Sequence, residues 1–244
     1  MQNQRRVKPM KIFAISDLHL SFMVEKPMDI FGGHWENYTE KIKENWQKTI
    51  SDDDLVLICG DISWAMKMSE TVKDFEYIDS LHGKKIIIRG NHDYWWKSIS
   101  AIRETLPASI SALQNDSMKV GNVVIAGTRG WEVCEGNMDF NFSEQDKKIF
   151  NREVIRLRLA LEDAMKRKEK GDKLICMIHY PPFNSHRDDS GFTKLFEEFK
   201  VDAVIYGHIH NNIGRYERLI VKNGIPYYLT SADMLHMKPA EIVL

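Results

Sequence analysis

Five short apolar segments of the chain are each followed, within a few residues, by side chains that bind metal ions. The groups that follow them are Asp17-Leu18-His19, Gly60-Asp61, Gly90-Asn91-His92-Asp93, His179 and Gly207-His208-Ile209-His210. Five of the nine histidines fall in these positions, which make up a small part of the chain. Imidazole, carboxylate and amide oxygen together suit Mn, Fe or Zn, whereas Ca²⁺ prefers oxygen alone. The pattern predicts a transition-metal centre.

The apolar segments have the character of buried strands. They cover residues 11–16, 55–59, 84–89, 173–178 and 203–206, are rich in Ile, Val and Leu, and lack polar alternation. Such runs are typical of parallel strands covered on both faces. Ligands of open α/β sheets lie beyond the carboxyl ends of the strands, where all five groups fall. In an extended segment residues i and i+2 point the same way, so we expect Asp17 to converge with His19, and His208 with His210.

Helical patterns lie between the strands and indicate an α/β fold with mixed sheets. They cover residues 36–50, 70–81, 94–106 and 143–170, with a shorter helix over 193–199. A strand over 120–126 is expected after a turn near Asn115. Asn223-Gly224 lies between the β-rich runs 219–221 and 226–229, and this dipeptide indicates a type I′ hairpin.

The composition is that of an ordinary globular chain. Its 244 residues are 43% hydrophobic and 28% charged, which predicts one domain over 11–244 after a loose, polar tail at residues 1–10. The net charge of −1 disfavours extended binding along nucleic acid, which usually needs a basic excess. No apolar run is long enough to span a membrane. Three scattered cysteines and an N-terminus unlike a secretory signal favour the cytoplasm.

The five groups, in this order, resemble the calcineurin-like metallophosphoesterase superfamily over residues 17 to 210. The resemblance implies two mixed β-sheets packed as a sandwich flanked by helices, an α/β/β/α arrangement with a dinuclear metal centre at one edge. The implied cofactors are two divalent transition-metal ions (Mn, Fe or Zn). By this resemblance one ion takes Asp17, His19 and His210, the other takes Asn91, His179 and His208, and Asp61 bridges them.

The function that the resemblance implies is hydrolysis of a small phosphomonoester or phosphodiester, by in-line attack of a hydroxide that bridges the two metals. His92 falls on the catalytic imidazole of the family, which would protonate the leaving oxygen or stabilise its charge, and Asp93 would orient it. The alternative is a non-catalytic metal-binding scaffold or protein-interaction module of the same fold. Such scaffolds tend to lose ligands, and none is missing here. The oligomeric state stays open.

A further segment, Thr128-Arg129-Gly130-Trp131, follows a strand and pairs a side chain that binds phosphate with one that stacks on organic groups. Arg129 and Trp131 are therefore candidate substrate contacts, and a structural ion pair is the alternative for Arg129. Arg89 is a weaker candidate, since a residue at the end of a strand can face away from the site. Trp64, Trp95 and Trp96 either line the pocket or pack in the core.

Overall fold

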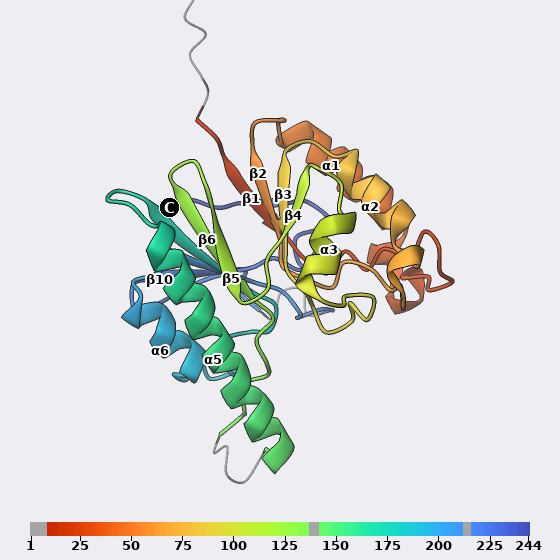
Figure 1. Ribbon diagram of the computed structural model, residues 1–244. Coiled ribbons are helices and arrows are strands. Elements are labelled where there is room, and N and C mark those ends of the chain that lie inside the picture. Colours follow the sequence, from red (N-terminus) through yellow and green to blue (C-terminus); the bar gives the residue numbers. More distant parts are fainter. Residues whose placement is uncertain (1–8, 137–141, 212–215) are drawn as a thin grey trace, which may run out of the picture.

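The first of two β-sheets is built around three parallel pairs of strands. The computed structural model describes residues 9–136, 142–211 and 216–244 (Figure 1). The sheet has the order β11-β1-β2-β3-β4. Its parallel strands are β1 (Ile12–Ile15), β2 (Leu55–Ile58), β3 (Lys84–Ile87) and β4 (Ile110–Ala112), and β11 (Ala240–Glu241) is antiparallel to β1.

The second sheet is also mixed and has the order β5-β6-β7-β8-β10-β9. The parallel strands are β6 (Val123–Thr128), β7 (Lys173–Ile178), β8 (Ala203–Tyr206) and β10 (Ile225–Leu229). The edge strands β5 (Asp116–Val120) and β9 (Leu219–Lys222) are antiparallel to their neighbours. Ser16 N donates to Thr230 O at 2.8 Å, so the carboxyl end of β1 meets that of β10 and the two sheets share one such edge.

Helices cover the outer face of each sheet, as Figure 1 shows. The first sheet carries α1 (Tyr38–Thr49), α2 (Val72–Asp79) and α3 (Ile99–Thr105), and the second carries α5 (Glu144–Arg167) and α6 (Gly191–Glu198). Short 3-10 turns lie at Asp29–Phe31, Gly33–Trp35 and Met68–Glu70. None of the helices in the described ranges combines the length and hydrophobicity that crossing a bilayer requires.

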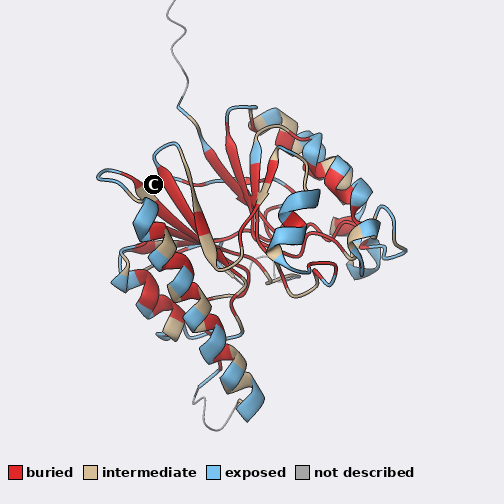
Figure 2. Cartoon of the chain, viewed as in Figure 1, coloured by how far each residue is buried: buried red, intermediate tan, exposed pale blue. Residues whose placement is uncertain are grey.

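Alternate residues of the strands face different layers, and this divides the core. In β2, Leu55 and Leu57 pack between the two sheets, whereas Val56 and Ile58 pack against the helices. All four side chains are fully buried. Figure 2 shows the strands as largely buried between helices whose outer faces are exposed. The predicted α/β/β/α sandwich of two mixed sheets is therefore confirmed.

Several predicted elements have different limits in the structure. The helix expected over 94–106 begins only at Ile99, because Ser98 is its N-cap and accepts a hydrogen bond from Ala101 N. The strand expected over 120–126 is β6, which begins only at Val123, because Gly121 has φ 59° and turns the chain there, so that β5 and β6 form a hairpin. Strands β4 and β11 were not anticipated, since two or three residues give too little pattern to detect.

Other expectations are confirmed. Asn223 and Gly224 have φ values of 52° and 80°, the two left-handed residues that a type I′ turn requires, and they join β9 to β10. The helix predicted over 143–170 is α5 with 24 residues, twice the 12 residues of α1, the next longest described helix. Of the predicted tail at 1–10, residues 1–8 lie outside the described part of the chain.

The N-cap of α6 gives a test of how the loop after β7 is held. Ser190 Oγ accepts hydrogen bonds from Phe192 N and Thr193 N and donates to Pro182 O at 2.5 Å. Ser190 is buried, whereas Ser143, the N-cap of α5, is exposed. We expect Ser190→Ala to lower the free energy of unfolding by about 2 kcal/mol, because a buried carbonyl also loses its donor, and Ser143→Ala by about 0.5–1 kcal/mol. Urea denaturation of both variants measures the difference, and equal losses would contradict it.

Candidate metal centre

The side chains predicted as metal ligands meet at the shared carboxyl edge of the two sheets. Asp17 N donates to Gly60 O at 2.9 Å, and Gly207 N donates to His179 O at 3.0 Å. The two sheets are joined here as well, because His208 N donates to the carboxylate of Asp17 at 3.0 Å. Backbone contacts thus hold the ends of β1, β2, β7 and β8 in one place.

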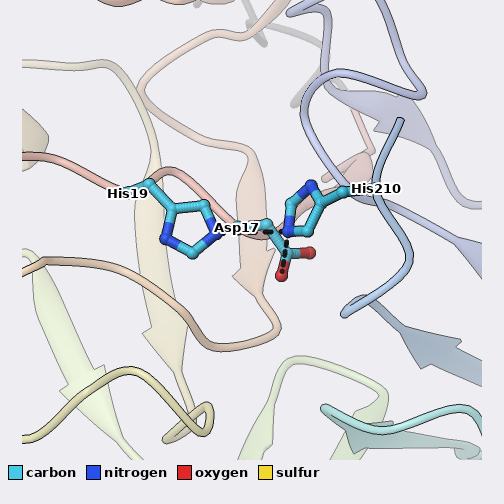
Figure 3. A group of neighbouring side chains, drawn as sticks. All are labelled: Asp17, His19 and His210. Atoms are coloured by element: carbon cyan, nitrogen blue, oxygen red, sulfur yellow. Dashed lines mark hydrogen bonds and ion pairs between the residues drawn. The ribbon is translucent and has the colours of Figure 1, made fainter. Parts of the chain in front are cut away.

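One group of ligands consists of Asp17, His19 and His210 (Figure 3). His210 Nε2 lies 3.2 Å from Asp17 Oδ1 and 3.1 Å from His19 Nε2. Asp17 is fully buried and His19 is 3% exposed. One ligand atom from each residue therefore points into a small space, which two buried side chains and the partly exposed His210 enclose.

A second group lies beside the first and contains Asp17, Asp61 and His179. Asp61 Oδ2 is 3.5 Å from His179 Nε2 and 3.9 Å from His19 Nε2, so Asp61 lies between the two groups. Asn91 Oδ1 is 2.7 Å from His179 Nε2 and 2.9 Å from His208 Nδ1. The predicted ligands are therefore all at this edge, and the carboxylate of Asp61 is within reach of both halves.

The directions of the ring nitrogens fit bound cations. His179 Nδ1 is 2.8 Å from Cys59 O, so Nδ1 carries the proton and the lone pair of Nε2 faces the oxygen of Asn91. Burial lowers the pKa of His179 to about 3, which keeps the ring neutral. His210 Nδ1 is likewise 3.0 Å from Asp233 Oδ1, which turns its Nε2 toward Asp17. Lone pairs that face one another in a buried space are stabilised by a positive ion between them.

The backbone that carries these side chains is not extended, which corrects the predicted geometry. Asp17, His19, Asp61 and His208 have φ values of 58°, 46°, 51° and 72°. Asp17 and His19 do converge, but through left-handed turns and not through the alternation of a strand. His208 and His210 do not converge in one group, because His210 lies against Asp17 and His208 against Asn91. A left-handed conformation is uncommon for residues other than glycine and costs about 1–3 kcal/mol. Four such residues in one cluster point to a functional site.

Two glycines let the strand ends approach the carboxylates. A Cβ on Gly90 would overlap the carboxylate and the backbone nitrogen of Asp61, and a Cβ on Gly207 would overlap the side chains of Ser16 and Asp17. Neither clash can be relieved by a flexible side chain alone, since backbone or buried atoms are involved. Glycine is therefore required at both positions by the close packing of the site.

The electrostatics of the edge are dominated by burial and by two carboxylates. Burial, with Asp17 and Asp93 nearby, raises the pKa of Asp61 well above its usual value. Burial alone would also raise the pKa of Asp17, but His210 and the other histidines hold it far below its usual range. Burial works against protonation of His210, yet Asp17 and Asp233 raise its pKa to about 10. Without an ion, one imidazolium therefore balances the cluster.

His92 lies beside the ligands, as predicted, and its environment is partly open. Its backbone nitrogen donates to Asp61 Oδ1 at 2.8 Å, and its ring centroid is 5.7 Å from that of His19 and 4.7 Å from that of Trp64. Burial lowers the pKa of His92. The ring thus lies next to the candidate metal ligands and belongs to neither of the two groups.

The role predicted for Asp93 requires a correction. Its Oδ1 accepts hydrogen bonds from Ile62 N, Ser63 N and Trp95 Nε1, and its Oδ2 accepts one from Gly90 N. Among the described residues no hydrogen bond joins Asp93 to His92, whose Nδ1 is buried without a partner. Asp93 therefore fixes the loop that carries His92 and not the imidazole itself, because backbone amides already occupy the carboxylate.

The side chains of Arg129 and Trp131 lie behind the candidate ligands and are connected to them through the backbone of Arg129 and the ring of Tyr180. Arg129 O accepts the backbone hydrogen bond of His179 at 3.0 Å, while its guanidinium is 3.7 Å from Glu153 and 5.1 Å from the ring centroid of Trp131. Trp131 packs on Tyr180, whose ring is 4.4 Å from that of His208. The ion pair that was the alternative for Arg129 is present, and contact of either residue with a substrate stays a prediction.

Sequence reasoning missed some residues of the site. Asp233, which is 1% exposed, holds His210 and accepts from Asn211 N at 2.8 Å, but an aspartate after the last predicted strand carries no distinguishing signal. The sequence left open whether Trp64 lines the pocket or packs in the core. Its ring stacks on that of His19 with a centroid distance of 4.7 Å. Trp95 and Trp96 belong to the core.

A cavity of about 460 Å³ opens beside His208. Its wall includes the rings of Phe183, Tyr206 and Tyr216, and the side chains of Ile209 and Ile220 also line it. Carboxylates of Glu132, Glu135 and Glu217 and the guanidinium of Arg187 also line it, and Arg187 pairs with Glu217 at 2.6 Å. A ligand held at the metal edge can therefore extend into a space with aromatic rings on one part of its wall and acidic side chains on another.

The sequence model of the family described as Calcineurin-like phosphoesterase matches residues 10–212. An uncharacterized protein of Methanocaldococcus jannaschii, MJ1445, is 28% identical over 93 residues, which is 38% of this chain and 52% of that protein. The match thus spans about half the length of this curated relative.

Two solved structures share the fold. TT1561 of Thermus thermophilus superposes with a TM-score of 0.60 at 12% identity, covering 96% of this chain and 99% of that one. The phosphopantetheinyl hydrolase of Mycobacterium tuberculosis superposes with a TM-score of 0.55 at 13% identity, covering 96% and 95%. At these identities the likeness concerns the fold alone, and it agrees with the predicted sandwich.

The first prediction for this site concerns metal uptake. Protein dialysed against Mn²⁺ should retain about two ions per chain, as two adjacent ligand groups require. Asp61→Asn should lower the bound metal at both positions, because Asp61 lies between them, whereas Asp163→Asn, on the outer helix α5, should not change it. Elemental analysis of the three proteins measures this. Retention of no more than trace metal by the unaltered protein would contradict two sites.

A second prediction follows from the raised pKa of His210. Below pH 10 the ring is protonated in the metal-free protein, and an ion needs its neutral form, so uptake must displace about one proton. Affinity at this position should therefore rise about tenfold per pH unit between pH 7 and 9. Titration calorimetry in two buffers of different ionisation enthalpy counts the proton. Asp233→Asn, which lowers the pKa of His210, should reduce the count, and proton release unchanged by that substitution would exclude His210 as its source.

Proposed function

Because this chain belongs to the calcineurin-like phosphoesterase family, we propose that it is a metal-dependent phosphohydrolase that cleaves a small phosphomonoester or phosphodiester. The observation that carries the proposal is the buried cluster of converging carboxylate, imidazole and amide ligands with His92 beside it. Family membership supplies the reaction class, and the cluster supplies the groups that this class uses.

The residues that would hold two divalent ions are those predicted from the sequence. Asp17, His19 and His210 would take one ion, Asn91, His179 and His208 would take the other, and Asp61 would serve both. Such ions, when bound, neutralise the charge of a phosphoryl group and lower the pKa of water. Mn, Fe and Zn all suit this mixed set of nitrogen and oxygen ligands.

His92 would move a proton at the leaving oxygen. Its loop is fixed by the backbone hydrogen bond to Asp61, and the rings of Trp64 and Tyr94 flank it at centroid distances of 4.7 and 6.1 Å. These contacts restrict the imidazole to one region beside the ligands. A positioned imidazole of this kind contributes roughly 10²–10⁴ in rate when the leaving group needs protonation.

The organic part of the substrate would lie in the cavity beside His208. Its aromatic walls favour a hydrophobic group, and three glutamates against one arginine disfavour a second negative charge there. Arg129 and Trp131 remain proposed substrate contacts on the neighbouring loop. The alternative of a non-catalytic scaffold is disfavoured, because the predicted ligands and His92 are all brought together.

The cell compartment and the extent of the domain are part of the same proposal. Cys59, Cys134 and Cys176 are buried free thiols, which suits a reducing cytoplasm. The two sheets share one layer of core residues, which favours a single domain over residues 11–244.

A direct test uses Mn-loaded protein with p-nitrophenyl phosphate and bis-p-nitrophenyl phosphate. We expect metal-dependent release of p-nitrophenolate from at least one of them, and its loss in Asp61→Asn. A panel of nucleotides and phosphopantetheine diesters would follow. The diesters are included because the phosphopantetheinyl hydrolase of Mycobacterium tuberculosis shares this fold. No turnover of any ester by protein that holds two ions would favour the scaffold.

The proton-transfer role of His92 has its own signature. His92→Ala should keep the metal content and lower kcat by about 10²–10⁴ on an ester with an alkyl leaving group. The loss should be much smaller on p-nitrophenyl phosphate, because p-nitrophenolate needs little protonation. His34→Ala, a nearby histidine outside the ligand groups, serves as the control. Equal losses on both esters would leave His92 only an electrostatic role.

A further inference from the structure

A second, smaller cavity lies on the other side of the loop that carries Arg129. It has a volume of about 260 Å³ and is lined by Arg89, Leu113, Gln114, Asn115, Arg129, Arg152, Glu153 and Arg156. Arg89 follows β3, Arg129 follows β6, and the other two arginines lie on α5. Elements of both sheets thus contribute guanidinium groups to one pocket, which we call the arginine pocket.

The positive charge of the arginine pocket is only partly balanced. Glu153, which is 1% exposed, is the carboxylate among the residues that line it. One oxygen, Oε1, lies 2.6 Å from Arg156, 3.2 Å from Arg152 and 3.7 Å from Arg129. Nearby Asp116 is engaged by Arg103 at 2.5 Å. Four guanidinium groups therefore line a pocket that contains one carboxylate, and an anion in the pocket would reduce the repulsion between them.

Donors in the arginine pocket also lack acceptors. Arg89 Nε is buried and has no hydrogen-bond partner among the described residues. The oxygens of Asn115 and Gln114 accept from Thr128 and Trp96, which leaves their amide NH₂ groups as further donors. A buried charged donor without an acceptor is costly. The pocket is therefore rich in donors and poor in acceptors, which is the composition of an anion site.

We propose that the arginine pocket binds a dianionic phosphate group, at a position separate from the metal edge. Guanidinium groups bind phosphate oxygens in pairs, and several of them converging on one small cavity match its charge and its shape. Glu153 holds three of the side chains in place before the ligand arrives. Leu113 is the one apolar residue of the lining, so the pocket offers little surface to an organic group.

The arginine pocket and the metal edge are physically connected. Arg89 directly precedes Gly90 and Asn91, and the backbone oxygen of Arg129 accepts from His179 N. The same two loops therefore carry arginines on one side and metal ligands on the other. The phosphate has two possible sources: a second phosphate of the substrate, or free phosphate that binds while hydrolysis proceeds. The proposal that the pocket binds phosphate does not depend on the proposed function. The idea that this phosphate belongs to the substrate does rest on the proposed function.

The binding test uses the full chain and inorganic phosphate and pyrophosphate, with titration calorimetry in the presence and absence of Mn²⁺. A binding event that needs no Mn²⁺ should weaken at least tenfold in Arg152→Met, a half-exposed position whose loss leaves the fold intact, and in Arg89→Met. The control is Arg158→Met, on the same helix but paired with Glu198 on the outer surface. Melting temperatures identify any variant that fails to fold. Equal affinity in all four proteins, or no binding without Mn²⁺, would overturn the proposal.

Kinetics distinguish the two sources of the phosphate. If it belongs to the substrate, Arg152→Met should raise KM at least tenfold for a nucleoside 3′,5′-bisphosphate and leave KM for the 5′-monophosphate unchanged. If it is free phosphate, added phosphate should alter the rate on both nucleotides, and Arg152→Met should remove that effect. A chain without any hydrolytic activity would refute the proposed function and leave the binding result standing, so the two failures are separable.

Discussion

The mutual repulsion of buried lone pairs and carboxylates at one sheet edge is the constraint on which the site depends. Asp17 and Asp61 are both buried, and neutral imidazoles of His19 and His179 point their nitrogens toward them. Burial raises the pKa of Asp61, while a protonated His210 keeps Asp17 ionised. Such a cluster is unfavourable in an apolar interior and becomes favourable around cations. The rest of the architecture keeps these groups together despite that repulsion.

The sandwich supplies the rigidity that this requires. The two sheets pack face to face through residues such as Leu57, Ile86 and Ile175, and their carboxyl ends are joined by backbone hydrogen bonds. Asp17, His19, Asp61 and His208 can then be held in left-handed conformations that cost about 1–3 kcal/mol each. Strain of this size persists only where the surrounding core over-determines the backbone. A less tightly packed edge would relax and separate the ligands.

Three kinds of environment lie around the edge, and each suits a different part of a ligand. The candidate metal ligands are buried and polar, the cavity beside His208 combines aromatic rings with acidic side chains, and the arginine pocket is cationic. The loop of Arg129 separates them: its backbone holds β7 through His179, its guanidinium faces Glu153, and Trp131 reaches toward Tyr180. One short segment therefore contacts both the candidate metal edge and the arginine pocket.

The sequence alone determined the strands that carry the chemistry and the set of candidate ligands. Unbroken apolar runs ending in Asp, Asn and His are a local signal, and the order of the groups is specific enough to identify the family over most of the chain. The type I′ turn at Asn223-Gly224 was equally local. The helix limit near Ile99 and the turn at Gly121 were missed although their signals are local, since Ser98 caps the helix through Ala101 N and Gly121 lies in the tight turn between Val120 and Val123. The apolar pattern by itself does not locate the ends of elements.

Only the tertiary structure decided which side chains serve one another. The sequence around Asp93 does not tell whether its carboxylate orients an imidazole or holds a loop. Its hydrogen bonds from Ile62 N and Ser63 N, about 30 positions away, and from nearby Gly90 N and Trp95 Nε1 show that it holds the loop. Asp233 supports His210 across 23 positions of sequence. The arginines around Glu153 come from both halves of the chain. These contacts are long-range, so their physical cause is packing between layers, and a pattern of neighbouring residues does not contain it.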